Sequence, residues 1–378
     1  MESIPLVDLQ AQQAEIADEI REEIDYILWS AAFIGGPAVA RFEKAYAEFT
    51  GTRHCVGVGN GTDALELALR ATGVRARGEV ILPANSFVAT AEAVARIGAV
   101  PVFVDVDPLH LLIDPEKVAD AVGPRTQAIV PVHLFGQLAP MPQIMEIALA
   151  AGVPVIEDAA QSQGAQHAGQ VSGSFGAAAA TSFYPGKNLG AAGDAGAVTT
   201  NDPEIAAMVR VLGAHGSSSK YVHDVVGMNS RLDTIQAVVL NAKLQRLPRW
   251  NAMRREAAAR YSAMLGRVPG VVAPVGRADY EDAWHLYVVQ VDNRDAVLAE
   301  LNAAGIGAGI HYPTPIHLTK AFSYIGKGLG DFPVAEAAAS RILSLPLFPH
   351  ISVKQQERVF GVVRGSRRGI SMQVGDKL

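Results

Sequence analysis

The chain is organised around one stretch, Ser182-Phe183-Tyr184-Pro185-Gly186-Lys187-Asn188-Leu189-Gly190, which sets a single lysine between turn residues and apolar, strand-like segments. No other Lys, Arg, Asp or Glu occurs between Asp158 and Asp194. Because desolvation disfavours an ammonium ion, an amine in apolar surroundings tends toward a lowered pKa. A lysine that condenses with an aldehyde or ketone needs that property. We therefore single out Lys187 as a candidate reactive amine.

Lys187 could also be a solvated surface charge or part of a phosphate-binding loop. Most lysines on loops are simply solvated surface charges. Gly186-Lys187 resembles the end of a phosphate-binding loop, but Asn188 replaces the required Ser or Thr and Thr181 replaces the first glycine. The phosphate-loop interpretation therefore fails, and the choice between surface charge and reactive amine depends on the rest of the chain.

Composition and charge limit the class of protein. Of the 378 residues, 49% are hydrophobic and 19% are charged, which supports a large buried core and argues against disorder. The net charge of -6, without a long run of one sign, argues against a nucleic-acid partner. No basic start followed by an apolar run and no membrane-length apolar segment occurs. With the single Cys55 suiting a reducing compartment, we predict a cytoplasmic protein without membrane contact or a metal site.

From Cys55 onward, short apolar strands alternate with helical segments. Because this alternation is typical of βαβ units, it predicts an α/β fold with a mostly parallel sheet and helices on both faces. We expect strands at Cys55–Val58, Glu79–Leu82, Pro101–Val106, Ala128–Val132 and Val153–Glu157. Ligands bind beyond the carboxyl ends of the strands in such sheets, so the residues that follow each strand are the candidates for a site.

The flanking regions predict the domain organisation. The spacing of apolar residues predicts one amphipathic helix over residues 10–29. A helix that Pro248 interrupts marks a change near residues 245–270. We therefore predict a large domain at 1–247, including the N-terminal helical segment, and a smaller C-terminal α/β domain at 248–378. The tail from Arg364 is Gly-rich and polar, and we expect it to be loosely ordered.

Three candidate groups follow the predicted strands. Gly59-Asn60-Gly61-Thr62-Asp63 opens a helix, and the N–H groups of a helix start make a natural phosphate cradle, although a simple capped turn accounts for it equally well. Phe87 faces either a ligand or the core. Glu157 and Asp158 end an apolar strand, where a buried carboxylate needs a partner or protonates; an ion pair or a helix cap is the alternative.

The amine, the acid and the glycine-rich helix start form the set that pyridoxal phosphate requires. Its aldehyde needs an amine, its ring nitrogen needs a carboxylate to stay protonated, and its phosphate needs N–H and hydroxyl donors. The chain also closely resembles the sugar aminotransferases of the DegT–DnrJ–StrS group, which are pyridoxal-phosphate enzymes of fold type I. The matching motifs, in chain order, are Asn60-Gly61-Thr62-Asp63-Ala64-Leu65, Pro83-Ala84-Asn85-Ser86-Phe87-Val88-Ala89-Thr90, Glu157-Asp158-Ala159-Ala160-Gln161, the Lys187 stretch, Asn229-Ser230-Arg231-Leu232-Asp233 and His311-Tyr312-Pro313.

The resemblance implies a role for each matched residue. Lys187 would form the Schiff base with the cofactor and shuttle the proton, while Asp158 would pair with the ring nitrogen. The remaining cofactor contacts would be Gln161 near the ring hydroxyl, Phe87 against the ring face, and Gly61, Thr62, Ser182 and a second subunit's Asn229 on the phosphate. We therefore expect a homodimer with shared active sites.

The substrate prediction rests on the surroundings of these motifs. Lys220 and Tyr221 offer a cation and a hydroxyl for a diphosphate, unless their loop is merely solvated surface. Tyr184 and His311 are the other predicted substrate-binding residues. The pattern around Lys220, with Gln161 instead of histidine, resembles members that aminate a 3-keto-6-deoxy sugar on thymidine diphosphate. We predict amino transfer from L-glutamate to C3 of such a sugar.

Several alternatives remain beside this prediction. A 4-keto nucleotide sugar is the first alternative acceptor, and a ketocyclitol is the second. Sugar dehydratases of the same fold replace the anchoring lysine with histidine, whereas Lys187 is present here. A regulatory protein that keeps the fold without turnover would have no need of Lys187, Asp158 and Ser182 together.

Overall fold

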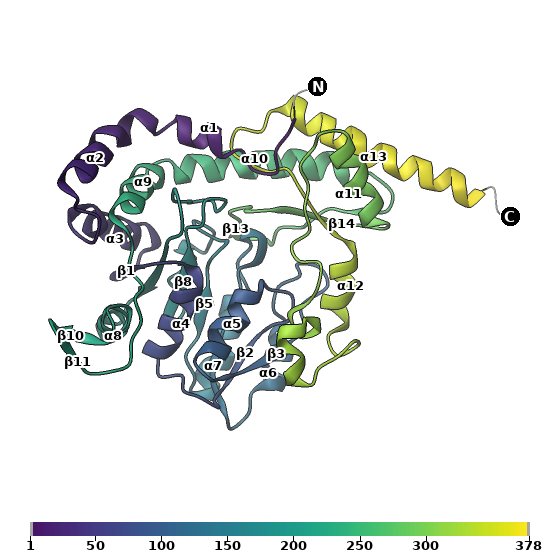
Figure 1. The fold of residues 1–378 in the computed structure, drawn as a ribbon. Helices are drawn as coiled ribbons and strands as arrows, with labels where there is room; N and C mark the ends of the chain where they lie inside the picture. Colours follow the sequence, from purple (N-terminus) through teal and green to yellow (C-terminus); the bar gives the residue numbers. More distant parts are fainter. Residues whose placement is uncertain (1–2, 376–378) are drawn as a thin grey trace.

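The centre of the molecule is a mixed β-sheet with helices on both sides (Figure 1). The computed structural model describes residues 3–375. Bridges from Ile129 to Val155 and from Val132 to Asp158 join a four-stranded and a three-stranded part of the sheet. Among the described strands of this sheet β9 alone has the reversed direction, so that it pairs antiparallel with β1 and β8, which confirms the predicted mostly parallel mixed sheet. Across the sheet the strands are β1 (His54–Val58), β9 (Gly196–Thr200), β8 (Ala178–Ser182), β5 (Ile156–Asp158), β4 (Thr126–Ile129), β2 (Glu79–Pro83) and β3 (Val100–Val104).

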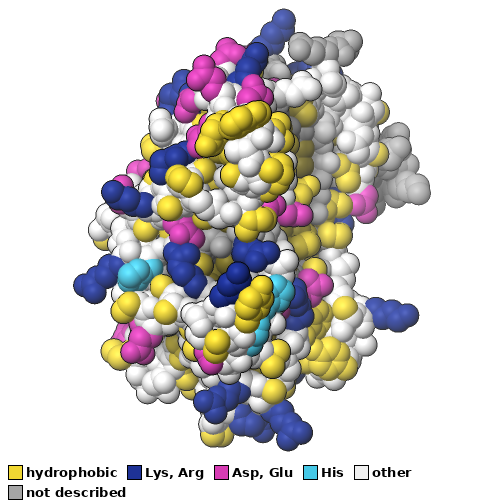
Figure 2. Space-filling view, turned by 60° about the vertical axis from the view of Figure 1, so that its left-hand side comes forward, with side chains coloured by type: hydrophobic (Ala, Val, Ile, Leu, Met, Phe, Trp, Pro, Cys, Tyr) yellow, Lys and Arg dark blue, Asp and Glu magenta, His cyan; other side chains and the backbone are white. Residues whose placement is uncertain are grey.

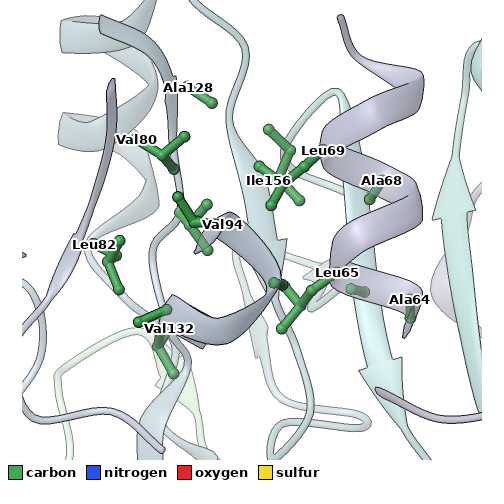
Figure 3. Packing of buried hydrophobic residues seen from close by; sticks show 14 of the residues in the cluster. Ala64, Leu65, Ala68, Leu69, Val80, Leu82, Val94, Ala128, Val132 and Ile156 are labelled. Carbon is green, nitrogen blue, oxygen red and sulfur yellow. The ribbon is translucent and has the colours of Figure 1, made fainter. Parts of the chain in front are cut away.

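Alternate residues of each strand supply two separate cores, because successive side chains of a strand point to opposite faces. Val80 and Leu82 of β2 pack with helices α4 (Gly61–Ala71) and α5 (Val88–Arg96) on one face (Figure 3). Ile81 belongs to the core on the other face, with helices α6 (Pro115–Ala121) and α7 (Met141–Ala151).

The β1 end of the sheet is covered in the same way. Helix α8 (Pro203–Gly213) joins α4 on the first face. On the opposite face Cys55 packs with helices α2 (Ala17–Ser30), α3 (Pro37–Thr50) and α9 (Thr234–Leu244). This second group of helices also contacts the chain beside Lys187, because Phe183 lies edge-on against the rings of Phe42 and Tyr46 in α3.

The single helix predicted over residues 10–29 is wrong. The chain forms α1 (Leu9–Ala14) and then α2, with a break at Glu15 and Ile16. Glu15 accepts a hydrogen bond from the side chain of His350 at 2.6 Å, and Ile16 is fully buried. These tertiary contacts outweigh the continuous helical periodicity of the segment.

The C-terminal part has its own antiparallel sheet, β12 (Val271–Val272), β14 (Tyr287–Val291) and β15 (Ile342–Leu345). Helices α10 (Leu247–Leu265), α11 (Arg294–Ala303) and α13 (Val353–Gly375) accompany it. Ile4 pairs with Ile306 and lies in this core, so the first residues cross to the C-terminal part. The division at 247/248 stays a prediction.

Two local predictions need correction. The predicted break between two helices is present, but it lies at residues 245–246; Pro248 occupies the first turn of α10, where its missing N–H costs no intrahelical bond. The described part of the tail, through Gly375, belongs to helix α13, and residues 376–378 lie outside the described residues.

Short elements complete the structure. The predicted loop around Lys220 is a hairpin of β10 (Ser217–Ser219) and β11 (Val222–His223), and α12 (Pro333–Arg341) follows the His311 segment. Among the helices that the structure describes, none combines the length and apolar character needed to cross a bilayer. A small third sheet contains β6 (Gln166–His167), β7 (Gln170–Val171) and β13 (Tyr280–Glu281), and short 3-10 helices lie at Leu134–Gly136, Ile316–Leu318 and Lys320–Ile325.

Candidate active site

The Lys187 loop is held closed at its base by backbone hydrogen bonds. Phe183 N–H donates to the carbonyl of Ala195, and Ala191 N–H donates to the carbonyl of Phe183, both at 2.8 Å. A Cβ atom on Gly190 would lie 2.2 Å from the carbonyl oxygen of Pro185, so only glycine fits there. The turn residues on both sides of Lys187 thus fix the loop at the end of β8.

Burial lowers the pKa of the Lys187 amine to about 8, and the nearby Asp158 carboxylate opposes part of that shift. An amine with this pKa is partly unprotonated near neutral pH, as condensation with an aldehyde requires. The structure therefore favours a reactive amine over a solvated surface charge. Lys243 also lies in apolar surroundings, with its ammonium donating to the carbonyl of Gly190 at 2.8 Å and its pKa lowered to about 8.

Asp158 ends β5 and is only 6% exposed. The Thr90 hydroxyl donates to its Oδ2 atom at 2.8 Å, and the Ala160 N–H donates to its Oδ1 atom at 3.2 Å. Burial raises the pKa of Asp158, whereas both hydrogen bonds and the Lys187 charge hold it down. Thr90 stands in one of the matched motifs but was not predicted as a site residue.

Glu157, the adjacent acid, has a different role. It is fully buried and accepts hydrogen bonds from the N–H groups of Gly173, Phe175 and Gly176 at 2.7–2.9 Å. His133 Nδ1 accepts from the Ala139 N–H, so its Nε2–H donates to Glu157 at 2.9 Å. Glu157 is therefore a structural anchor, and Asp158 is the acid available to the site.

The start of α4 lies beside Ser182. Asn60 caps this helix by accepting from the Asp63 N–H at 2.8 Å, and Gly61 and Thr62 are its first two residues. A Cβ atom on Gly61 would come within 2.6 Å of Ser182 Cβ. Because the first N–H groups of a helix have no intrahelical partner, this close approach places N–H donors next to the Ser182 hydroxyl. That arrangement fits a phosphate group.

Phe87 and Tyr312 form an aromatic wall. Phe87 is 50% exposed, and its ring centroid lies 5.1 Å from that of Tyr312. Gln161 accepts from the Phe135 N–H at 2.7 Å and donates to the Tyr312 hydroxyl at 3.1 Å. Burial raises the pKa of Tyr312, so its hydroxyl stays protonated at neutral pH. Tyr312 belongs to one of the matched motifs but was not predicted as a site residue.

His311 adjoins this wall. Its Nδ1 atom lies 2.8 Å from the Ser344 hydroxyl of β15. Burial and the Lys187 charge both lower the pKa of His311, which places it near the reactive amine as a neutral imidazole.

The remaining predicted residues lie at the surface of the single chain. Tyr184 is 59% exposed, Tyr221 is 83% exposed at the hairpin turn, and Lys220 Nζ sits 5.2 Å from the centre of the Tyr221 ring. Asn229 is exposed and pairs with Ala214. Interactions with Tyr312 and Lys187 bring together Asp158, Phe87, Gln161 and His311. Gly61, with Thr62 next to it, lies against Ser182 at the end of β8, whereas Tyr184, Lys220, Tyr221 and Asn229 are exposed.

Residues 14–364 match the model of the DegT/DnrJ/EryC1/StrS aminotransferase family. This chain belongs to that family. The predicted resemblance and the prediction of an aminotransferase are therefore confirmed.

Curated relatives of this aminotransferase align over nearly the whole chain. It is 46% identical to UDP-N-acetyl-3-dehydro-alpha-D-glucosamine 3-aminotransferase of Acidithiobacillus ferrooxidans, covering 97% of this chain and 99% of the relative. It is 45% identical to the erythromycin biosynthesis sensory transduction protein EryC1 of Saccharopolyspora erythraea, covering 96% and 99%. It is 42% identical to dTDP-3-amino-3,4,6-trideoxy-alpha-D-glucose transaminase of Streptomyces venezuelae, covering 96% and 95%.

Solved structures agree with the fold of the aminotransferase. The S. venezuelae DesV structure, in complex with a ketimine intermediate, superposes with a TM-score of 0.94 at 42% identity, covering 97% of this chain and 99% of DesV. NtdA from Bacillus subtilis, solved with bound cofactor PMP, gives a TM-score of 0.90 at 30% identity over 97% of this chain and 86% of NtdA. The predicted fold class and the predicted pyridoxal-phosphate dependence are confirmed at the level of the family.

The side chains of this aminotransferase fit that cofactor. The Gly61–Ser182 approach fits its phosphate, Asp158 fits its ring nitrogen, and the Lys187 amine fits its aldehyde. No group of three or more His, Cys, Asp or Glu side chains in the described part of the chain is placed to hold a metal ion.

Proposed function

We propose that this aminotransferase moves the amino group of L-glutamate to C3 of a 3-keto-6-deoxy sugar carried on thymidine diphosphate. The observation that carries the proposal is the Lys187 amine, with its pKa lowered to about 8 by burial, beside the hydrogen-bonded Asp158 carboxylate. The position on the sugar is supported by relatives whose names specify a 3-amino or 3-dehydro sugar on a nucleotide.

Each side chain has a defined task in this proposal. Pyridoxal phosphate, when bound, acts as the electron sink for the carbon that gains or loses nitrogen. Lys187 Nζ would hold the cofactor aldehyde and move a proton to and from that carbon. Asp158 would keep the ring nitrogen protonated, while Gly61, Thr62 and Ser182 would hold the phosphate. Phe87 would cover one ring face, and Gln161 and Tyr312 would border the ring and substrate.

The hairpin around Lys220 is our candidate for the nucleotide diphosphate site. Lys220 and Tyr221 are both exposed, so a cation and a hydroxyl are free to meet a diphosphate. Figure 2 turns the α2 and β10–β11 side of the molecule forward, and Lys and Arg side chains gather near the middle of this face. The position of the hairpin outside the Lys187 region suggests that it serves the site of a neighbouring subunit, with Tyr184 and His311 completing the sugar pocket.

The same face supports a homodimer as the active unit. Hydrophobic side chains gather in its upper part (Figure 2), and Leu28 and Trp29 at the end of α2 are 55% and 83% exposed. Ile34, which is 58% exposed, pairs with Asp233, so this apolar surface continues to the segment that begins at Asn229. A contiguous exposed apolar surface of this kind marks a protein interface. We propose that Asn229 reaches the phosphate site of the partner across it.

A regulatory protein is the second candidate function, because the EryC1 relative carries a sensory-transduction name. A sensor that only binds its ligand needs neither an amine with a lowered pKa nor a carboxylate held by Thr90. The chemistry of the side chains therefore favours the enzyme. Release of 2-oxoglutarate from glutamate separates the two, since a binding protein would release none.

The substrate is tested by giving the loaded enzyme L-glutamate with matched 3-keto and 4-keto dTDP sugars. Lys187→Ala serves as the inactive control. NMR of the product locates the new amine. We expect an amino sugar from the 3-keto substrate, with the nitrogen on C3. Amination only at C4, or only of a ketocyclitol, would overturn the substrate while leaving the aminotransferase assignment unchanged.

A further inference from the structure

Three residues with buried amide side chains are linked by hydrogen bonds behind the Lys187 loop. They are Asn188, Asn251 and Gln163, which are 1%, 3% and 1% exposed, and the link from Asn251 goes to the main-chain carbonyl of Gln163. Asn188 follows Lys187, Asn251 lies in the second turn of α10, and Gln163 follows the Asp158 strand. The amide chain therefore connects three segments that are far apart in the sequence.

The first link fixes the lysine loop. Asn188 Nδ2 donates to Asn251 Oδ1 at 3.0 Å and to the Ala283 carbonyl at 2.8 Å. Because an amide oxygen can only accept, the contact of Asn188 Oδ1 with His285 Nδ1 at 3.1 Å is a hydrogen bond donated by Nδ1–H. Burial and the nearby Lys187 charge lower the pKa of His285. Every polar atom of the Asn188 side chain is thus committed to holding one loop conformation.

The second link runs from Asn251 to the segment after Asp158. Asn251 Nδ2 donates to the main-chain carbonyl of Gln163 at 2.8 Å. The next residue, Gly164, has a φ of +87°, and a Cβ atom there would lie 2.6 Å from Asn251 Nδ2. The backbone at this point therefore both adopts a conformation that favours glycine and makes room for the Asn251 amide.

The third link reaches the phosphate donor. Gln163 Nε2 donates to the Ser182 carbonyl at 2.8 Å and lies 3.1 Å from the Thr181 hydroxyl and 3.3 Å from the Ala160 carbonyl. Ala160 is the residue whose N–H donates to Asp158. One amide group thus touches both the strand end that carries Ser182 and the turn that holds Asp158.

We propose that Asn251 is a positioning residue that fixes the relative positions of three proposed cofactor-binding residues, Lys187, Asp158 and Ser182. It acts through Asn188 on Lys187, and through Gln163 on Asp158 and Ser182. This inference rests on the proposed roles of those three residues. It assigns a task in cofactor binding to a side chain of α10, a helix that begins at the predicted domain division, far in sequence from the motifs.

The test measures cofactor affinity of the apo protein, with Asn251→Leu as the main variant. Removing the Asn251 amide takes away the partner of one Asn188 side-chain N–H and of the Gln163 main-chain carbonyl. The lysine loop and the Asp158 turn then lose the hydrogen bonds that join them. We expect the dissociation constant for pyridoxal phosphate to rise about tenfold or more, since supporting contacts of ligating groups typically carry effects of about 10–100-fold.

Gln356→Met is the matched control. Gln356 is also a fully buried amide that contacts α10, donating to the Ala257 carbonyl at 2.8 Å and accepting from Arg260 at 2.7 Å, but it lies outside the amide chain. We expect this variant to lower the melting temperature without changing cofactor affinity. Equal affinity losses in both variants, at equal losses of melting temperature, would overturn the positioning role.

Ligand fragments show which grip is lost. Pyridoxal lacks the phosphate and reports on Lys187 and Asp158, whereas pyridoxamine phosphate lacks the aldehyde and reports on the phosphate grip and Asp158. We expect Asn251→Leu to weaken both. Weakening of neither would overturn the inference. If Asn251→Leu does not fold, Asn251→Asp removes the donor to Gln163 but keeps the acceptor for Asn188, and should weaken pyridoxamine phosphate more than pyridoxal; the reverse order would count against it.

A double-mutant cycle adds a readout that general destabilisation does not produce. If Asn251 acts on Lys187 through Asn188, the affinity loss of Asn188→Ala and Asn251→Leu together is smaller than the product of the single losses. Independent, multiplicative losses would contradict a shared path. Lys187→Ala distinguishes failure of the proposed function from failure of this inference. If Lys187→Ala still binds the cofactor covalently, the proposed function is refuted. If Lys187→Ala loses covalent binding but Asn251→Leu keeps normal cofactor affinity, only this inference is refuted.

Discussion

The hydroxyl of Thr90, on α5, donates a 2.8 Å hydrogen bond to Oδ2 of Asp158 at the end of β5. Thr90 is itself 2.7 Å from the Ser86 hydroxyl, so the donor is held in place. Burial raises the pKa of Asp158, and the Thr90 bond is the largest of the contacts that lower it. Thr90 therefore helps to keep ionised the carboxylate that the cofactor ring requires.

Thr90→Val should slow the enzyme without unfolding it. The substitution keeps the shape of the side chain but removes a hydrogen bond to a charged group, which is worth about 1.5–3 kcal/mol. We expect kcat/KM to fall about tenfold to a hundredfold, and Thr90→Ser, which retains the hydroxyl, to recover most of it. Steady-state kinetics with melting curves check this; wild-type kinetics in Thr90→Val would show that the bond has no role in catalysis.

Asp158→Asn should have a larger effect. An amide does not hold the ring nitrogen in its protonated form, so stabilisation of the transition state is expected to fall by several kcal/mol, on the order of 3–4 kcal/mol. Single-turnover rates with glutamate measure the loss directly. If the variant runs within about threefold of wild type, Asp158 is a structural cap for the Ala160 turn instead.

The Lys187 amine predicts a pH dependence of the apo protein. Its folded pKa of about 8 lies below the usual value of 10.5, so between these values the unfolded chain binds more protons than the native protein. Stability from this group is therefore lowest below pH 8 and rises between pH 8 and 10.5, by up to about 3 kcal/mol.

Comparison with Lys187→Met isolates the effect of Lys187. Lys243 titrates over the same pH range, but it is present in both proteins, so its contribution cancels in the difference. Chemical denaturation at a series of pH values should show that the free energy of unfolding of the wild type increases relative to that of Lys187→Met as the pH rises above 8. A constant difference between the two proteins from pH 7 to 10.5 would mean that the Lys187 amine is not desolvated in the native state.

Mixed dimers test the shared site. Lys187→Ala and Asn229→Ala subunits are each expected to be inactive alone, but a hybrid contains one site with neither change. After mixing and re-association, about one quarter of wild-type activity should return, since half of the dimers are hybrids with one intact site. Subunits that form hybrids by native mass spectrometry yet recover no activity would refute the role of Asn229.

The sequence predicted the site residues that lie close together in short motifs at strand ends. Lys187 and Asp158 stood out because they are charged residues in apolar segments, and parallel strands bring their carboxyl ends to one edge. Because strand side chains alternate, Glu157 and Asp158 point to opposite faces of the sheet. Only the structure shows that the Glu157 carboxylate accepts hydrogen bonds from three N–H groups and His133.

What the sequence missed depends on contacts between distant segments. Tyr312 and Gln161 are 151 residues apart in the sequence, and Asn251 and Gln163 are 88 residues apart, so no local sequence pattern predicts either hydrogen bond. The break between α1 and α2 was missed for the same reason, because Glu15 is held by His350 from the other end of the chain. Local periodicity predicts elements, while such bonds are set by tertiary packing.

The most direct test of the proposed site is the identity of the lysine that binds the cofactor. Two lysines of the described chain, Lys187 and Lys243, have pKa values that desolvation lowers to about 8, and of these two only Lys187 lies beside Asp158. Borohydride reduction of the protein loaded with pyridoxal phosphate, followed by peptide mapping by mass spectrometry, fixes the cofactor to the amine that holds it. We predict the label on Lys187, with its loss in Lys187→Ala and in protein first treated with L-glutamate. A label on Lys243, or a Lys187 label that glutamate does not discharge, would contradict the assignment of Lys187 as the reactive amine.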